Sequence, residues 1–291
     1  MSVERLFLLP VLSAILALAA CAGLPTPAER VGNADALAAG QGWHRLVLAA
    51  GAFDLTAFVP DRPGAGEVLT VYIEGDGFAW ASASQPSLDP TPIHPVGLEL
   101  ALRDPRGNAA YLARPCQYLP AQSRNCDSDY WTDRRFAPEV VAASGVALDA
   151  LKARAGARRL VLVGYSGGAA VAALLAARRG DVDALITVAG NLDHQAWTSF
   201  HQVRPLVGSL DPTAYVAQLQ AVPQVHYAGE RDTVVPPALL RGYAARFPAA
   251  QRPRVRVVAG QEHLCCWAEQ WPALIREAIQ DIDAERIPAG K

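Results

Sequence analysis

The segment Leu160-Val161-Leu162-Val163-Gly164-Tyr165-Ser166-Gly167-Gly168 joins a short apolar run to a stretch of small residues, 169–179. The apolar run is typical of a buried strand, and the small residues favour a helix. A serine between the two needs a sharp turn, in which bulky neighbours would collide with both elements. The glycines two positions before and two after Ser166 avoid that collision. Gly-x-Ser-x-Gly also occurs in ordinary turns, so the flanking strand and helix are what make Ser166 a candidate nucleophile.

A second strand end supplies an acidic candidate. The sequence Gly229-Glu230-Arg231-Asp232-Thr233-Val234-Val235-Pro236 follows an apolar run at 224–228. A carboxylate there can hold an imidazole in its useful tautomer, although an aspartate before two prolines is also typical of a turn or helix cap. We favour Asp232, with Asp193 as the runner-up and Glu230 as a weaker choice.

The candidate base is His263. It follows an expected strand at 254–258 and precedes the last expected helix, 268–283. Most histidines in proteins have structural roles, and the other five lie in an early strand, in loops or inside a strand: His44, His94, His194, His201 and His226.

The order Ser166, Asp232, His263 resembles that of the α/β-hydrolase superfamily. The resemblance spans nearly all of residues 43–283 and includes the family pattern Gly-x-x-Asp-x-x-Val-Pro around Asp232. It implies an α/β fold in which helices cover both faces of a mostly parallel sheet. The domain is expected at 43–285, followed by a tail at 286–291. Expected strands are 43–49, 53–59, 68–73, 109–113, 160–163, 184–188, 224–228 and 254–258, and expected helices are 137–155, 169–179, 236–247 and 268–283.

The resemblance also implies a mechanism. Ser166 would attack a carbonyl, His263 would move the proton and Asp232 would orient His263, with an acyl-enzyme intermediate and no metal or organic cofactor. The expected activity is that of a carboxylesterase or lipase-like enzyme on a small-molecule ester. A peptidase or amidase with the same triad is an alternative, as is a catalytically silent hydrolase-fold protein that binds a partner.

An oxyanion hole needs backbone N–H groups near the nucleophile. The resemblance assigns one to Gly167 and the other to the loop Glu74-Gly75-Asp76-Gly77-Phe78, at Asp76 or Gly77. Many family members carry His-Gly where this chain has Glu74-Gly75. An ordinary turn is the alternative interpretation of Gly-Asp-Gly.

Two segments without regular pattern, 78–95 and 190–221, follow expected strands and are expected to form pocket walls. We expect substrate contacts from Phe78, Tyr165, His194 and Trp197. For residues 191–201, a surface helix with scattered aromatic side chains is an equal alternative.

Residues 1–20 form an expected signal peptide, with Arg5 before an apolar stretch at 6–20. The end of this segment, Leu18-Ala19-Ala20-Cys21, resembles the bacterial lipobox. That resemblance implies lipidation of Cys21, a flexible tether at 21–42 and a place in the cell envelope, at the outer membrane facing the periplasm. Ordinary cleavage after Ala22, which gives a soluble exported protein, is the alternative.

If the protein is exported, its other cysteines are expected to form disulfides, because disulfides persist in oxidising compartments. We favour a disulfide between Cys116 and Cys126, which closes a short polar loop. Cys265 and Cys266 would then form a vicinal disulfide or stay free. A zinc site is the weaker alternative, since no Cys-x-x-Cys pattern supports it.

Composition excludes several other classes of function. The formal net charge is −2 with no basic stripe, so nucleic acid is not an expected partner. The sequence contains no phosphate-binding P-loop, no Gly-x-Gly-x-x-Gly and no His-Glu-x-x-His.

Overall fold

The expected parallel sheet forms the centre of the structure, a computed structural model that describes residues 23–286 apart from 65 and 121. Its strand order is β1-β2-β4-β3-β5-β6-β7-β8. The hairpin of β1 and β2 is antiparallel and joins β4 antiparallel, whereas all pairs from β4 to β8 are parallel. The strands are β1 Trp43–Ala50, β2 Phe53–Pro60, β3 Val68–Ile73, β4 Ala109–Leu112, β5 Arg159–Tyr165, β6 Val182–Val188, β7 Gln224–Gly229 and β8 Arg254–Val258.

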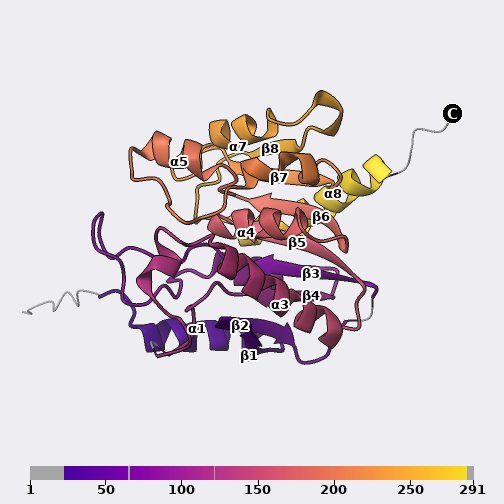
Figure 1. The fold of residues 1–291 in the computed structure, drawn as a ribbon. Coiled ribbons are helices and arrows are strands. Elements are labelled where there is room, and N and C mark those ends of the chain that lie inside the picture. Colours follow the sequence, from indigo (N-terminus) through magenta and orange to yellow (C-terminus); the bar gives the residue numbers. More distant parts are fainter. Residues whose placement is uncertain (1–22, 65, 121, 287–291) are drawn as a thin grey trace, which may run out of the picture.

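Helices cover both faces of this sheet (Figure 1). One core cluster joins the sheet to α3, α4 and α7, and the other joins it to α1, α2 and α8. The helices are α1 Pro27–Ala39, α2 Val96–Leu102, α3 Pro138–Arg154, α4 Gly167–Ala176, α5 His194–His201, α6 Val216–Leu219, α7 Pro237–Ala244 and α8 Trp267–Arg286, with short 3₁₀ turns η1 Ser128–Trp131, η2 Pro212–Tyr215 and η3 Ala249–Gln251.

The central strand β5 shows why these apolar runs become strands buried on both faces. Leu160 and Leu162 belong to the core on the α3 and α4 side, whereas Val161 and Val163 belong to the core on the α8 side. Successive side chains of a strand point to opposite faces, so a strand covered on both sides is apolar throughout. The confirmed fold class follows from this pattern.

The N-terminal region differs from the expected tether at 21–42. Residues 27–39 form helix α1, which begins with a capping box between Thr26 and Glu29 and carries Pro27 in its first turn. Ala34 and Ala38 are buried against the sheet, and Arg30 is also buried. The tether prediction is therefore wrong for this stretch, because the small residues that suggested a flexible chain are the buried face of a helix.

Several predictions fall outside the described residues. These are the signal peptide at 1–20, the lipidation site Cys21 and the C-terminal residues 287–291. Within the described part of the chain, no helix has the length and apolar character needed to span a membrane.

Candidate active site

Ser166 occupies the turn between β5 and α4. Its φ is 49° and its ψ −121°, a backbone conformation that few residues other than glycine adopt. At Gly164 and Gly168, a Cβ would collide with the backbone of α4 and of β3 respectively. The turn is fixed from the neighbouring strand, because the Ser166 N–H donates to the Val188 carbonyl at 3.0 Å. The flanking glycines thus serve the close packing that the sequence suggested.

The three predicted catalytic side chains meet at the carboxyl ends of the parallel strands. His263 Nε2 lies 3.0 Å from Ser166 Oγ, and His263 Nδ1 lies 2.8 Å from Asp232 Oδ2. A carboxylate can only accept, so Nδ1 carries the hydrogen and Nε2 is left to accept the serine hydroxyl. The result is a continuous hydrogen-bond chain from a carboxylate to a serine oxygen.

Asp232 is held by its own turn. Its side chain is buried, and Oδ1 accepts the N–H groups of Val234 and Val235, both at 2.8 Å. These two bonds orient the carboxylate so that Oδ2 faces His263. The runner-up acids have other partners: Asp193 caps α5 and pairs with Arg246, and Glu230 accepts the N–H of Gly260.

The loop that carries His263 is tied down on both sides. The backbone carbonyl of His263 accepts hydrogen bonds from the Tyr165 hydroxyl at 3.0 Å and from the Trp267 indole N–H at 3.1 Å. The Gln261 side chain accepts the N–H of Cys266 at 2.8 Å. Cys265 and Cys266 form a vicinal disulfide, the first of the two alternatives left by the sequence. The imidazole is thus positioned by a closed turn rather than by a free loop.

The predicted oxyanion loop after β3 lies beside the nucleophile. A Cβ at Gly75 would stand 3.1 Å from Ser166 Cβ. Within the described chain, the N–H groups of Gly167, Asp76 and Gly77 donate no hydrogen bond, whereas the N–H of Gly75 donates to the side chain of Glu74. The N–H groups that the sequence named as oxyanion donors therefore have no hydrogen-bond acceptor within the described chain.

The Asp76 carboxylate packs directly on Gly167. A Cβ at Gly167 would overlap both carboxylate oxygens of Asp76. The carboxylate forms ion pairs with two buried arginines, at 2.6 Å to Arg135 and 3.3 Å to Arg114. A carboxylate beside a developing oxyanion would oppose it by like-charge repulsion, and the two guanidinium groups offset that charge.

Glu74 is the departure from the common family pattern, and it lies in a closed environment. Its carboxylate accepts the N–H groups of Gly75 and Gly97, at 2.9 and 3.1 Å, and the Tyr111 hydroxyl at 3.1 Å. Burial raises the pKa of Glu74 to about 7 despite these hydrogen bonds. A Cβ at Gly97 would stand 3.1 Å from the carboxylate, so the start of α2 is shaped around Glu74.

A cavity of about 390 Å³ opens in front of Ser166 and His263. Its wall includes three of the four predicted substrate-contact residues, Phe78, Tyr165 and Trp197. Further apolar lining comes from Trp80, Pro92, Ile93, Val234, Val235 and Leu264, and polar lining from Glu74, Asp76, His94, Arg135 and Asn191. The cavity is therefore lined mainly by apolar and aromatic side chains, with Ser166 and His263 among its polar residues.

His194 is not part of the cavity wall, so its predicted substrate contact is wrong. Its buried ring lies 6.0 Å from that of Phe136 and its Nε2 3.5 Å from Asp211 Oδ2. His194 is the first residue of α5, after the capping Asp193, and this turn directs the ring into the core. Burial lowers the pKa of His194, which favours its neutral form there.

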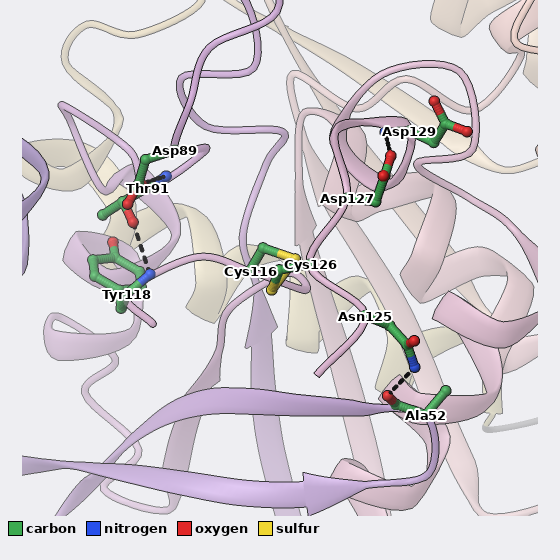
Figure 2. Close-up of a disulfide and its surroundings, with 9 residues drawn as sticks. All are labelled: Ala52, Asp89, Thr91, Cys116, Tyr118, Asn125, Cys126, Asp127 and Asp129. Atoms are coloured by element: carbon green, nitrogen blue, oxygen red, sulfur yellow. Dashed lines mark hydrogen bonds between the residues drawn. A yellow bond between two sulfur atoms is a disulfide. The ribbon is translucent and has the colours of Figure 1, made fainter. Parts of the chain in front are cut away.

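Cys116 and Cys126 form the favoured disulfide, with Cα atoms 5.4 Å apart. Figure 2 shows that hydrogen bonds from both ends of this loop reach other segments. Tyr118 donates its N–H to Thr91 Oγ1 at 2.7 Å, and the Asn125 amide donates to the Ala52 carbonyl at 2.6 Å. The disulfide loop therefore connects the segment around Thr91 with the β1–β2 turn.

The arginines at the site are the residues that sequence reasoning missed. Arg114 follows the end of β4, where a polar side chain reaches the same edge of the sheet as Ser166, so its position was a usable signal. Arg135 lies between the expected strand at 109–113 and the expected helix at 137–155, and no pattern there marked it. No cluster of His, Cys, Asp or Glu in the described residues has the composition to hold a metal ion.

Comparisons with known proteins bear on the fold. No protein-family model matches the sequence, and a search of curated proteins finds no match. Solved structures do match: Est1E from Butyrivibrio proteoclasticus has a TM-score of 0.56 at 13% identity and covers 82% of this chain and 99% of its own. The chain has the α/β-hydrolase fold.

Two further structures share this α/β-hydrolase fold. The Pyrococcus furiosus esterase Pf2001 has a TM-score of 0.58 at 14% identity and covers 84% of this chain and 94% of its own. XC6422 from Xanthomonas campestris, an α/β serine hydrolase without a lid, has a TM-score of 0.52 at 15% identity, with coverages of 86% and 97%. In an α/β-hydrolase the triad residues follow in the order Ser, Asp or Glu, His, which is the order found here.

Proposed function

We propose that this protein is a serine hydrolase that cleaves carboxylic esters. The observation that carries the proposal is the hydrogen-bond chain from Asp232 through His263 to Ser166, which opens into an apolar cavity. Each member of the chain has the atom that the chemistry requires at hydrogen-bonding distance.

The geometry supports a two-step reaction. Ser166 Oγ attacks the carbonyl carbon while its proton passes to His263 Nε2, and Asp232 stabilises the imidazolium that forms. The N–H of Gly167, with that of Asp76 or Gly77, would donate to the oxyanion. When the tetrahedral intermediate collapses, the alcohol leaves with the proton from His263. Water then attacks the acyl-enzyme, passes a proton to His263, and the carboxylic acid leaves as Ser166 recovers its hydrogen.

The cavity supports an ester with an apolar or aromatic part. Phe78, Trp80 and Trp197 contribute aromatic surface to its wall, and such side chains bind apolar groups. The structural neighbour Pf2001 is named an esterase, and one structure of the neighbour Est1E holds ferulic acid. These neighbours make esters of aromatic and aliphatic carboxylic acids the substrates to test first.

Paired hydrolysis assays test the proposal. We expect the protein to hydrolyse p-nitrophenyl acyl esters faster than aminoacyl or peptidyl p-nitroanilides, and Ser166→Ala to remove that activity. A preference for the anilides would replace the ester proposal by a peptidase or amidase. An unchanged rate in Ser166→Ala would exclude Ser166 as the nucleophile.

We also propose that the enzyme is anchored in the cell envelope by a lipidated Cys21. The described chain begins at the left of Figure 1, on the side where the loops after the parallel strands gather. An anchor before residue 23 would thus leave the domain close to the lipid surface. Mass spectrometry of the membrane-extracted protein should find an acylated N-terminal Cys21, whereas a soluble chain that begins at residue 23 would mean ordinary secretion.

A further inference from the structure

One buried charged side chain of helix α1, Arg30, contacts the cavity wall. Arg30 is 5% exposed. Its Nη1 donates to the carbonyls of Thr91 and Asp89, the latter at 3.3 Å, and its Nη2 lies 3.7 Å from Asp89 Oδ1. The guanidinium carbon lies 5.3 Å from the ring centre of Phe78. Arg30 therefore contacts both ends of the segment between Phe78 and Thr91.

This segment is a wall of the cavity in front of Ser166. Cavity-lining residues lie at both of its ends: Phe78, Ala79 and Trp80 at the beginning and Pro92, Ile93 and His94 at the end. Between residues 78 and 95 the described chain has no helix, and its only strand pairing is one isolated bridge, Trp80 with Pro86. The shape of the wall must therefore come mainly from contacts with other segments.

The residues that Arg30 contacts are joined to the oxyanion loop through Pro90, which lies between Asp89 and Thr91. The Phe78 N–H donates to the Pro90 carbonyl at 3.0 Å. A Cβ at Gly77 would collide with that same carbonyl. A shift of Asp89 and Thr91 would thus move Pro90, and with it the backbone that joins the oxyanion loop to the wall.

An arginine at this position needs an explanation beyond packing. A buried guanidinium loses its hydration and destabilises the fold unless its partners replace water. Two carbonyls, one carboxylate and one aromatic face replace part of that water, whereas Nε has no hydrogen-bond partner among the described residues. A planar group with several donors can satisfy them together, which a lysine ammonium or an apolar side chain cannot do.

We propose that Arg30 is a positioning residue that sets the shape of the cavity wall at 78–95 and so determines which bulky esters the site accepts. This inference rests on the proposed ester hydrolysis. Arg30 acts through Phe78 and the Asp89–Thr91 backbone, and the triad does not depend on it. Helix α1, which follows the expected anchor segment, is in this way part of the substrate site.

The test compares Arg30→Met with wild type on three esters: p-nitrophenyl acetate, p-nitrophenyl octanoate, enlarged in the acyl part, and 1-naphthyl acetate, enlarged in the alcohol part. We expect kcat/KM for at least one bulky ester to fall by roughly tenfold relative to p-nitrophenyl acetate, mainly through KM. Fluorophosphonate labelling of Ser166 should stay within about threefold of wild type, because the triad is intact and Asp76 keeps its ion pairs with Arg114 and Arg135.

A matched control separates wall shape from loosening of the helix. Asp35 on the same helix is half-buried and pairs with Arg45 at 2.8 Å, so Asp35→Asn weakens α1 while Arg30 keeps its own contacts with the wall. We expect Asp35→Asn to keep the wild-type ratio between bulky and small esters. Arg30→Lys, which keeps the charge and part of the contacts, should give an intermediate ratio, and it serves as the test variant if Arg30→Met does not fold.

Amide hydrogen exchange gives a readout that does not depend on turnover. Arg30→Met should raise exchange in residues 78–95 and leave the β5–α4 turn as in wild type. If wild-type protein does not react with the fluorophosphonate, the proposed function fails, while the exchange data still show whether Arg30 holds the wall. An Arg30→Met variant with the ester ratio and exchange of Asp35→Asn would overturn the inference.

Discussion

The catalytic chain and the cavity wall are held in place in two different ways. Asp232 and His263 lie a few residues beyond the ends of β7 and β8 and are oriented mainly by their own turns. The oxyanion loop and the wall, residues 74–95, are instead held by side chains from distant parts of the chain. These are Arg30 from α1, Arg114 after β4 and Arg135 before α3.

Under the proposed function, this difference separates the residues that carry out the reaction from those that select the substrate. The triad depends on strand ends that the parallel sheet brings together, so its geometry follows from the fold. The wall depends on buried ion pairs, and a change in one partner leaves the other charged and unpaired. We therefore expect changes in the triad to remove the chemistry and leave the fold intact, and changes around the wall to alter oxyanion stabilisation, selectivity or stability.

The largest effect is expected in the triad. His263→Ala should lower kcat by about 10⁴-fold or more, because triad members act as a unit. Steady-state hydrolysis of a p-nitrophenyl ester measures the loss, and circular dichroism should show an unchanged fold. Near-normal turnover in this variant would mean that another histidine acts as the base.

The second effect tests the contact between the two regions. Gly167→Ala places a methyl group where the Asp76 carboxylate lies, so it should displace the oxyanion loop and lower kcat by roughly 10²–10³-fold, the loss typical of one oxyanion donor. Gly242→Ala is a suitable control, since a Cβ there meets open space on α7. Equal kcat in the two variants would show that Asp76 does not constrain the nucleophile turn.

The smallest effect concerns Glu74 behind the oxyanion loop. Its pKa is raised to about 7 by burial, so the folded protein binds more protons than the unfolded chain between about pH 4.5 and 7. The free energy of unfolding contributed by Glu74 should therefore fall as pH rises through this range. Urea unfolding at several pH values should show this fall in wild type and its loss in Glu74→Gln.

The exposed Glu269 provides the control for that experiment. Glu269→Gln should keep the pH dependence of wild type, because an exposed carboxyl group is not desolvated on folding. A Glu74→Gln variant that is as pH-dependent as Glu269→Gln would mean that Glu74 is not the titrating group.

The sequence predicted the regions that local pattern determines. The strand before Ser166, the glycines around it and the turns after β7 and β8 are all visible within short windows. These windows were enough for the fold and for the three side chains that meet at the strand ends. The pairing of Cys116 with Cys126 could also be favoured, because a short loop lies between them.

The sequence did not predict contacts that close over long distances. Arg30 meets Asp89 and Thr91 about sixty residues away, and no local pattern marks that pairing. Helix α1 was missed because its proline and small residues are also typical of a tether, whereas here Pro27 lies in the first turn and Ala34 and Ala38 pack against the sheet. His194 was misplaced because the direction of a side chain at a helix start depends on the cap.

The central claim is that Ser166 is an activated nucleophile, and covalent labelling tests it most directly. Wild-type protein should react with a fluorophosphonate probe at one site, which peptide mass spectrometry locates at Ser166, and the His263→Ala variant should label far more slowly. Absence of labelling in folded wild-type protein, or labelling that persists in Ser166→Ala, would contradict the account.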